Sequence, residues 1–256
     1  MDDQIDRVQQ EFGARAEDYA TSPVHAQGPS LGRLIALTQP QRDWIVLDVA
    51  TGAGHTALTF APHVTQVVAV DLTREMLATA QRLATERGLT NIEFKTANAE
   101  NLPFDANTFN VVTSRMALHH YSDARKAIQE MARVCKPHGL VALVDNIVPP
   151  DKQVAGYINH YEKMRDPSHN WAFPVARLQA LFADAELELV HTETFSKEIE
   201  FEPWADRTKA TPETKAKLLE RLAQAPEGAR EFLAPRTEGT KTYFALTEAI
   251  LIGRKG

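Results

Sequence analysis

From about residue 44 onward, short apolar runs alternate along the chain with longer amphipathic stretches. The apolar runs are rich in β-branched residues and occupy residues 44–49, 66–71, 92–95, 109–114 and 140–144. Most of them are almost continuously apolar instead of alternating with polar residues. This pattern is typical of parallel strands that are covered on both faces.

The stretches between these runs have the spacing and the end signals of helices. One begins after Thr73, which can cap a helix, and ends at Gly88. Another begins after the possible cap Ser122 and stops before Pro137, which cannot continue a helix. Strands and helices in alternation predict right-handed βαβ units and an open parallel sheet of the α/β class.

Outside residues 44–144 the pattern is less regular. Residues 2–36 indicate two helices with a break near 21–23. The C-terminal part predicts a helix over 150–165, a loop over 166–174, a helix over 175–185, a strand over 187–194, a helical region over 203–234 and a last strand within 243–252. We expect one domain over 1–256, divided into N-terminal helices (1–36), a core (40–149) and a C-terminal region (150–256).

Composition and charge narrow the class of protein. The chain has 256 residues, 43% of them hydrophobic, and a formal net charge of -6, without a basic cluster of the kind that nucleic-acid binding needs. Its single cysteine, Cys135, excludes an internal disulfide and a zinc site of several thiolates. We found neither a targeting segment nor an apolar run long enough to span a membrane. The expectation is a cytoplasmic protein without nucleic-acid partners, membrane insertion or a metal site.

The strongest candidate for a binding site is the glycine turn between the first strand and the next helix. Gly52 and Gly54 let the backbone turn tightly and let a ligand lie against it. The following helix offers free N–H groups at its first turn. The candidate residues of this turn are Asp48, Ala50, Thr51, Gly52, Gly54 and His55. On its own the turn also fits the dinucleotide pattern G-x-G-x-x-A, so NAD remains an alternative.

Acidic and amide side chains at the ends of the next strands favour S-adenosylmethionine (SAM) over NAD. Asp71 ends the second strand, where a carboxylate can accept both ribose hydroxyls of an adenosine, a placement that suits NAD and SAM alike. Asp48 lies where it would oppose a pyrophosphate, which SAM lacks. After the third strand, Asn98 can accept a hydrogen bond from an adenine amino group. Leu72, Met76, Ala99 and Glu100 would complete that part of the site.

These motifs together resemble the class I SAM-dependent methyltransferases. They are the segments 47–55, 70–72, 98–104, 109–114 and 133–139. More narrowly, the chain resembles the group that includes the ubiquinone/menaquinone-biosynthesis C-methyltransferases and related small-molecule enzymes. The resemblance implies a Rossmann-like seven-stranded sheet of order 3-2-1-4-5-7-6 with an antiparallel last strand. It also implies N-terminal lid helices, a helical insertion after the fifth strand, and S-adenosylhomocysteine (SAH) as product.

The resemblance extends to individual positions. Ser114 and Arg115, at the end of the fourth strand, complete the implied cofactor site. Ala50 stands where the family usually has its first glycine, and Asn98 where it usually has an aspartate. Both replacements suit a SAM site, because a methyl group is small and an amide oxygen still accepts a hydrogen bond.

Histidines gather where an acceptor substrate would meet the methyl group. His120 follows the fourth strand, His169 lies in the region after the fifth, and His25 lies in the N-terminal segment. We hypothesise that all three face one pocket and that one of them is a general base or substrate anchor. Alternatively, they serve as helix caps or loop hydrogen-bonding groups. The aromatic residues Tyr157, Tyr161, Trp171 and Phe173 could line a substrate pocket or form the core of the inserted helices.

The sequence leaves several functions open. The favoured one is a methyltransferase acting on an O, N or C atom of a small molecule, as a monomer or homodimer. A quinone-ring C-methyltransferase is the alternative within that class. An NAD-dependent oxidoreductase is disfavoured by Asp48, and a SAM-binding regulator without turnover is disfavoured by the histidines.

Overall fold

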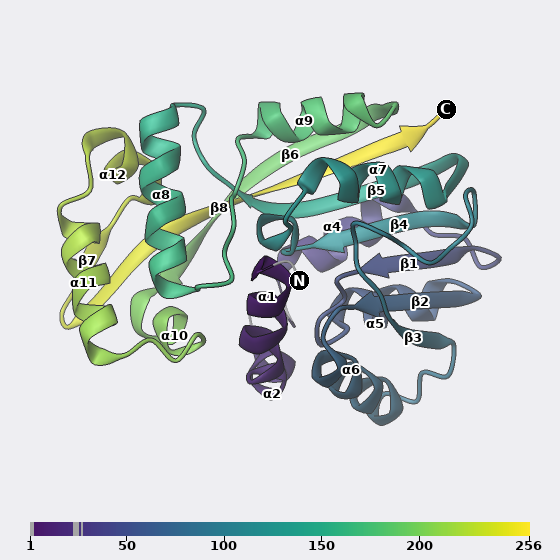
Figure 1. The fold of residues 1–256 in the computed structure, drawn as a ribbon, viewed down its shortest axis with the longest axis horizontal. Coiled ribbons are helices and arrows are strands. Elements are labelled where there is room, and N and C mark those ends of the chain that lie inside the picture. The colour runs from purple at the N-terminus through teal and green to yellow at the C-terminus, as the bar shows by residue number, and fades with distance from the viewer. Residues whose placement is uncertain (1–2, 23–25, 27) are drawn as a thin grey trace.

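The computed structural model describes residues 3–22, 26 and 28–256, in which strands and helices alternate through most of the chain (Figure 1). The helices are α1 (Asp3–Gly13), α2 (Ala16–Thr21), α4 (Pro29–Thr38), α5 (His55–Phe60), α6 (Arg74–Glu86), α7 (Ala124–Val134), α8 (Lys152–Arg165), α9 (Val175–Asp184), α10 (Phe201–Asp206), α11 (Pro212–Ala223) and α12 (Glu227–Leu233), with 3-10 turns η1 (Ala61–His63) and η2 (Leu118–His120). The strands are β1 (Ile45–Val49), β2 (Gln66–Asp71), β3 (Ile92–Thr96), β4 (Phe109–Arg115), β5 (Cys135–Ile147), β6 (Leu187–Glu200), β7 (Arg236–Glu238) and β8 (Lys241–Lys255).

The strands of the described residues form one sheet of order β3-β2-β1-β4-β5-β8-β6. Strands β1 to β5 pair in parallel, whereas β8 is antiparallel to both β5 and β6. The order and the antiparallel last strand that the resemblance implied are therefore confirmed. The sheet also has an unexpected eighth strand, the short β7, which pairs with β8 beyond the main path.

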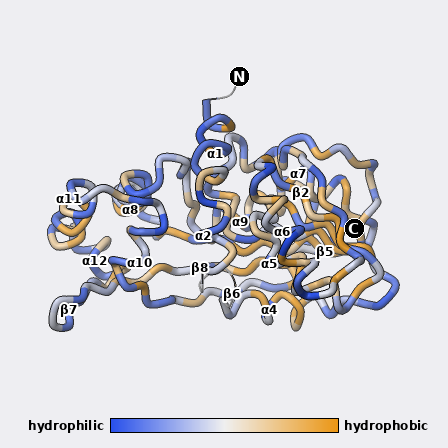
Figure 2. The backbone as a smooth tube through the Cα atoms, turned by 90° about the horizontal axis from the view of Figure 1, so that it is seen from below, coloured by the Kyte–Doolittle hydropathy of each residue, from blue (hydrophilic) through white to orange (hydrophobic). Residues whose placement is uncertain are grey.

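Both faces of the central strands are buried, which explains their continuous apolar runs. In β1, Leu47 and Val49 belong to a core that includes Ile128 of α7 and Phe182 of α9. Val46 points to the opposite face, into a core with residues of α4 and α5. Seen from below, hydrophobic segments gather around β2 and β5 (Figure 2). Alternate residues of one strand thus serve two cores, so most positions of the strand are apolar.

A second core lies where β6 and β8 continue past the rest of the sheet, beside α8, α10, α11 and α12 (left in Figure 1). Its centre is Tyr161, stacked on Trp204 with ring centroids 5.5 Å apart, and Phe244 against Trp204 at 4.9 Å. Tyr157 also packs against this core. Strand β6 is longer than the predicted 187–194, because its outer half is needed to support this second core.

The remaining two aromatic candidates also serve packing or lie at the surface. Phe173 packs against the core that contains α7, and Trp171 is an exposed large side chain. Of the four aromatic candidates, Tyr157, Tyr161 and Phe173 therefore pack in the core, and Trp171 lies at the surface.

Three predicted element boundaries are wrong in detail. The cap of α7 is Asp123, whose carboxylate accepts a hydrogen bond from the backbone N–H of Lys126 at 3.0 Å, and not Ser122. The expected turn at 136–139 is the irregular start of β5, with a register shift and His138 at φ 62°. In the described part of the N-terminal region, the helical segment before the predicted break is already divided into α1 and α2.

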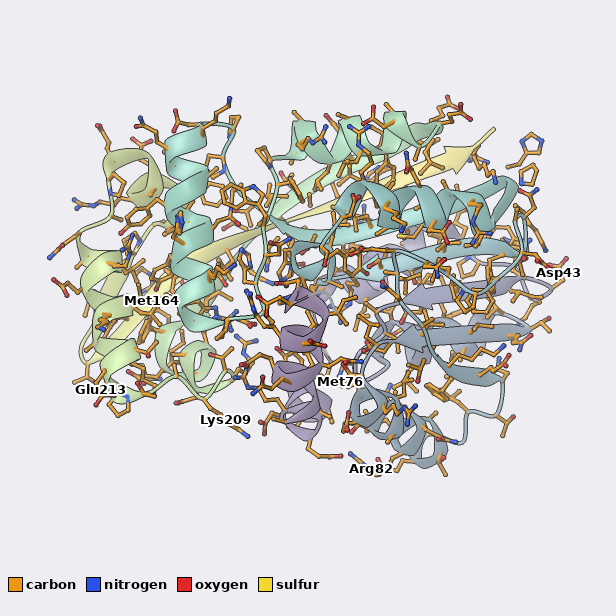
Figure 3. All side chains as sticks on the ribbon, viewed as in Figure 1. Asp43, Met76, Arg82, Met164, Lys209 and Glu213 are labelled. Carbon is orange, nitrogen blue, oxygen red and sulfur yellow. The ribbon has the colours of Figure 1, made fainter. Side chains whose placement is uncertain are left out.

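Helices α1 and α2 lie between the two parts of the molecule (Figures 1 and 3). On one side, Arg82 of α6 pairs with Glu17 of α2 at 2.7 Å. On the other, Lys209, which follows α10, donates a hydrogen bond to the carbonyl oxygen of Ala14 at 3.3 Å. Figure 3 shows Lys209 and Arg82 flanking these helices.

Within the described residues, no helix combines the length and apolar character needed to cross a bilayer.

Candidate functional site

A cleft of about 960 Å³, including its open mouth, lies at the carboxyl ends of β1, β2 and β4. Open α/β sheets bind their ligands at this edge. All but three of the predicted cofactor residues line this cleft. Those that line it are Ala50, Thr51, Gly52, His55, Asp71, Leu72, Met76, Asn98, Ala99, Glu100 and Arg115. Residues from four separate segments of the sequence therefore meet around one space.

Asp48 is one of the three predicted residues that do not line the cleft. Its carboxylate is buried beneath the glycine turn and accepts hydrogen bonds from Thr51 Oγ1 at 2.6 Å, Thr113 Oγ1 at 2.8 Å and the N–H of Ala57 at 3.2 Å. Burial raises the pKa of Asp48 to about 6. Asp48 thus joins the turn to α5 and β4, and the expectation that it faces the ligand is not met.

Gly54 and Ser114 are the other two. Gly54 has φ +85°, and a Cβ added to it would lie 2.8 Å from Cβ of Ala80, so this glycine permits the close approach of α6. Ser114 is fully buried, and its hydroxyl lies 3.0 Å from that of Tyr121, which does line the cleft. Both residues therefore shape the wall from behind.

The turn itself fits a ligand with an amino-acid tail and a ribose. A Cβ added at Gly52 would meet no atom within 4 Å, so the backbone there borders open space. Asp71 accepts one hydrogen bond from the N–H of Gly52 at 2.8 Å and another from that of Thr73 at 2.9 Å. Each carboxylate oxygen keeps acceptor capacity toward the cleft. Burial raises the pKa of Asp71.

The segment after β3 forms the far wall of the cleft. Asn98 Oδ1 accepts a hydrogen bond from the N–H of Glu100 at 2.9 Å, which holds the turn closed. The Glu100 carboxylate accepts from the N–H groups of Ser122 at 2.8 Å and Asp123 at 3.0 Å. Glu100 thereby links this wall to the start of α7.

His120 is the predicted catalytic residue that lines the cleft. Its Nδ1 lies 3.0 Å from the carbonyl oxygen of Ser168. Because a carbonyl only accepts, Nδ1 carries the hydrogen and Nε2 carries the lone pair in the neutral ring. Burial and the adjacent His119 lower the pKa of His120 to about 4, so this ring is neutral near pH 7.

The other two predicted histidines do not join it. His169 does not line the cleft, and its Nε2 lies 2.8 Å from Oδ1 of the buried Asn159. Burial lowers the pKa of His169 to about 2, so it stays neutral in this interior position. The expectation that His169 faces the pocket is therefore wrong, and His25 lies outside the described residues.

His119 has a different partner from its neighbour. Its Nδ1 lies 2.5 Å from Oδ1 of Asp145 on β5. Burial alone would lower the pKa of His119, but the charge and hydrogen bond of Asp145 outweigh it and raise the pKa above its usual value.

Within the described residues, no cluster of three or more histidine, cysteine, aspartate or glutamate side chains could hold a metal ion.

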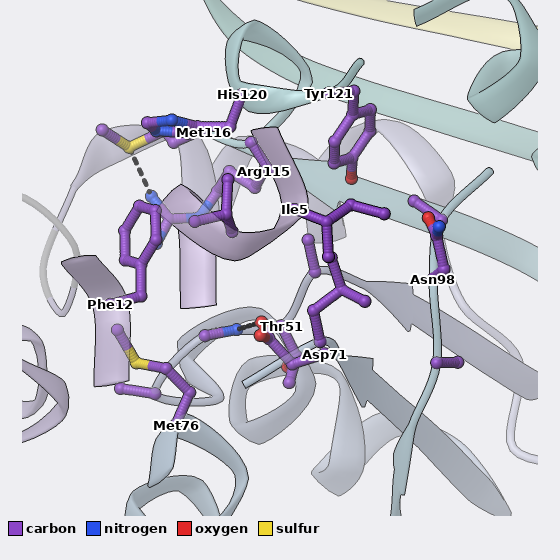
Figure 4. A pocket seen from close by; sticks show the side chains of 18 of the residues that line it. Ile5, Phe12, Thr51, Asp71, Met76, Asn98, Arg115, Met116, His120 and Tyr121 are labelled. Carbon is purple, nitrogen blue, oxygen red and sulfur yellow. Dashed lines mark hydrogen bonds between the residues drawn. The ribbon is translucent and has the colours of Figure 1, made fainter. Parts of the chain in front are cut away.

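Sequence reasoning missed the residues that cover the cleft. Ile5, Val8 and Phe12 of α1 line it, although no residue of α1 is fully buried. Figure 4 shows Ile5 and Phe12 over the cleft, with Asp71 on one side and His120 on the other. Their spacing of three and four residues is the signal that could have identified this face of α1.

Comparisons with known proteins agree with this geometry. A family model described as a methyltransferase domain matches residues 46–139. The uncharacterized methyltransferase YcgJ of Bacillus subtilis (strain 168) is 36% identical over 246 residues, which is 95% of this chain and 97% of that protein. Its crystal structure has a TM-score of 0.85 and covers 88% of this chain and 97% of its own. A Bacillus halodurans C-125 protein of known structure, 33% identical, also has a TM-score of 0.85 and covers 89% of this chain and 99% of its own.

The more specific resemblance is also found, over a shorter length. The ubiquinone/menaquinone biosynthesis C-methyltransferase UbiE of Idiomarina loihiensis is 37% identical over 109 residues, which cover 41% of this chain and 43% of that enzyme. The match to YcgJ runs over nearly the whole of both chains and shows the family. With its Rossmann-like sheet, this chain belongs to the class I methyltransferases, enzymes that use S-adenosylmethionine as methyl donor.

Proposed function

We propose that this enzyme transfers a methyl group from SAM to a small molecule, with the cofactor held in the cleft under α1. The observation that carries the proposal is the gathering of Gly52, Asp71, Asn98 and Arg115 around a single space at the carboxyl edge of the sheet. The enclosed position of this space, beneath a helix, suits a small acceptor.

The residues of the cleft would divide the binding of the cofactor among them. Asp71 would accept hydrogen bonds from the ribose hydroxyls, and the backbone at Gly52 would allow the amino-acid tail to lie close. Asn98, with Leu72 and Met76, would hold the adenine. When bound, SAM supplies a methyl group activated by its attachment to a positively charged sulfur.

His120 is our candidate for the group that accepts a proton from the acceptor. It lines the cleft beside Phe12, with ring centroids 5.0 Å apart. Its Nδ1–H is engaged by Ser168, which leaves the lone pair on Nε2 to accept. Around pH 7 the ring is in the neutral form that this role requires.

A quinone-ring acceptor is not favoured over other small molecules. The similarity to UbiE covers less than half of either chain. The second core around Trp204 would adjoin the acceptor. Unlike the cofactor half, it contains no sequence motif that indicates a particular substrate.

Calorimetric titration with SAM and SAH tests the cofactor site, using the parent, Asp71→Ala, Asp71→Asn and the control Asp43→Ala. Asp43 is exposed and lies at the far side of the molecule (Figure 3). We expect Asp71→Ala to weaken binding by at least about 10-fold and Asp71→Asn by less, because an amide oxygen still accepts. No binding of either ligand by the parent would refute the proposal.

Turnover is the second part of the test. Release of SAH is measured with a panel of small acceptors, some anionic and some neutral. Tight binding of SAM without release of SAH for any acceptor would favour a regulator that binds SAM without turnover.

A further inference from the structure

A second chamber adjoins the cofactor cleft and shares part of its wall. It has a volume of about 510 Å³, including its open mouth, and shares Phe12, Tyr19, Met116 and His120 with the cleft. Its other walls come from the ends of α8 and β5, from β6, β8 and α10. In Figure 1, α10 and the adjacent end of α8 lie beside α1. A molecule in this chamber would therefore lie next to His120, which also lines the cofactor cleft.

Three cationic side chains line this chamber against a single acidic one, Asp166. Two of the three have internal partners. Lys197 pairs with the buried Glu248, and Arg165 pairs with Glu162 at 3.1 Å. These two pairs therefore add little net charge to the chamber.

Arg207 differs from the other two cations. Within the part of the chain that the structure describes, its guanidinium has no hydrogen bond and no ion pair, although it is only partly exposed. Burial, followed by the charge of Arg165, lowers the pKa of Arg207. A partly buried arginine without a partner is costly, and an anion would offset this cost.

The surroundings of Arg207 are equally suited to an anion. Arg165 lies over the ring of Trp204, with its guanidinium carbon 4.6 Å from the centroid, which fixes its direction. Trp204 lines the chamber too, and its Nε1–H has no hydrogen-bond partner among the described residues. Asp166, the acidic residue of the chamber, is bound by the backbone N–H of Ser168 at 3.0 Å and by its hydroxyl at 2.5 Å, so Arg207 is the cation of the chamber that an anion could pair with.

We propose that the acceptor substrate is a small anion, whose carboxylate or phosphate binds Arg207 in the second chamber. Its reacting atom then lies at the wall that the chamber shares with the cofactor cleft, next to His120 and Met116. This inference rests on the proposed function and adds the chemical class of the acceptor. Arg207 is then a residue that determines specificity, and neutral analogues of the substrate bind poorly.

The test uses protein saturated with SAH and titrates it with benzoate, with its neutral analogue benzamide and with inorganic phosphate. The variants are Arg207→Gln, Arg207→Lys and the control Arg177→Gln, an exposed arginine on α9 without a side-chain partner in the described residues. We expect the parent to bind benzoate or phosphate in the millimolar range and Arg207→Gln to bind at least about 10-fold more weakly. Arg207→Lys should lose less anion affinity, because lysine keeps the positive charge but lacks the planar guanidinium that can donate two parallel hydrogen bonds.

The outcomes separate this inference from the proposed function. If SAH binds but benzoate binds no better than benzamide, or if Arg207→Gln binds anions as well as Arg177→Gln does, the inference is wrong and the proposed function stands. Absence of anion binding in the millimolar range would also overturn it. If the parent binds no SAH, both fall together. Unchanged SAH affinity in Arg207→Gln shows that this variant is folded.

Discussion

Gln4 Nε2 donates a hydrogen bond of 2.9 Å to the backbone carbonyl oxygen of His120, a residue 116 positions further along the chain. The same amide group donates to the carbonyl oxygen of Ser168 at 2.5 Å. Helix α1 is thereby attached to η2 and to the loop after α8. These contacts hold the helix across the cofactor cleft at the point where the second chamber begins.

Replacing Gln4 with alanine should loosen α1 over the bound cofactor. We expect Gln4→Ala to weaken SAH binding by about 5- to 30-fold, mainly through faster release, because it removes two hydrogen bonds that contribute roughly 1 kcal/mol each. Hydrogen exchange should also quicken in α1. Gln10→Ala, an exposed change on the same helix, is the control. Equal affinities in the two variants would show that α1 is not a lid.

Replacing His120 should affect methyl transfer more than cofactor binding. We expect His120→Gln to lower kcat by about 10²- to 10⁴-fold, the usual contribution of a general base, with SAH affinity changed only a few-fold. The control is His63→Gln, an exposed histidine in η1. Turnover of His120→Gln at the parental rate would exclude the proposed role.

The pH profile of the parent gives a second check on His120. The neutral ring is the active form, so activity should be lost as the pH falls through its pKa of about 4. A histidine with an unperturbed pKa would instead lose activity near pH 6.5. Measurement of kcat from neutral to acid pH, at saturating SAM, distinguishes the two. An acid limb near pH 6.5 that His120→Gln retains would assign the proton transfer to another group.

The glycine turn predicts opposite effects for two small substitutions. Ala50 has φ 52°, in the left-handed region, so Ala50→Gly should relieve strain and raise the free energy of unfolding, by at most about 1 kcal/mol. Gly54→Ala should destabilise by roughly 2 kcal/mol or more, because its Cβ would meet Ala80 at 2.8 Å. Gly239→Ala separates the two causes, since Gly239 has φ +59° with nothing within 4 Å. Urea denaturation measures all three, and equal losses for Gly54→Ala and Gly239→Ala would contradict the close-packing argument.

Asp48 should make stability depend on pH in an unusual direction. Its pKa is raised from 3.8 to about 6 in the folded protein, so the folded state holds this proton more tightly than the unfolded state. The resulting stabilisation is present below pH 3.8 and is lost as the pH rises through about 6. Asp48→Asn lacks this dependence.

Denaturant unfolding of the parent and of Asp48→Asn, at about pH 5 and about pH 7.5, measures the effect. The stability of the parent relative to the variant should fall by roughly 1–2 kcal/mol between these pH values. The titratable groups that both proteins share cancel in this comparison. A difference in stability between parent and variant that is the same at both pH values would therefore mean that the Asp48 carboxylate is ionised at both.

Local patterns in the sequence were sufficient for the strands of an open parallel sheet and for most of the cofactor cleft. The continuous apolar runs predicted buried parallel strands, and such strands bring Gly52, Asp71 and Asn98 to one edge of the sheet. This works because each of these residues lies at the end of a strand or within three residues after it, so its position depends mainly on its own strand. The order of the strands and the antiparallel direction of the last one came from the family resemblance, not from the pattern.

Side-chain direction and long-range contacts were decided only by the tertiary structure. Asp48 and Asp71 both adjoin the glycine turn, yet Asp48 is turned away from the cleft by Thr113, which is 65 residues distant. His169 is drawn into the interior by Asn159, and His120 is held at the cleft by Ser168. The second chamber needs β6, β8 and α10 to meet α1, so Arg207 had no recognisable role in the sequence. A local pattern determines which residues lie at the end of a strand, but the direction of a side chain depends on packing partners that are far away in the sequence.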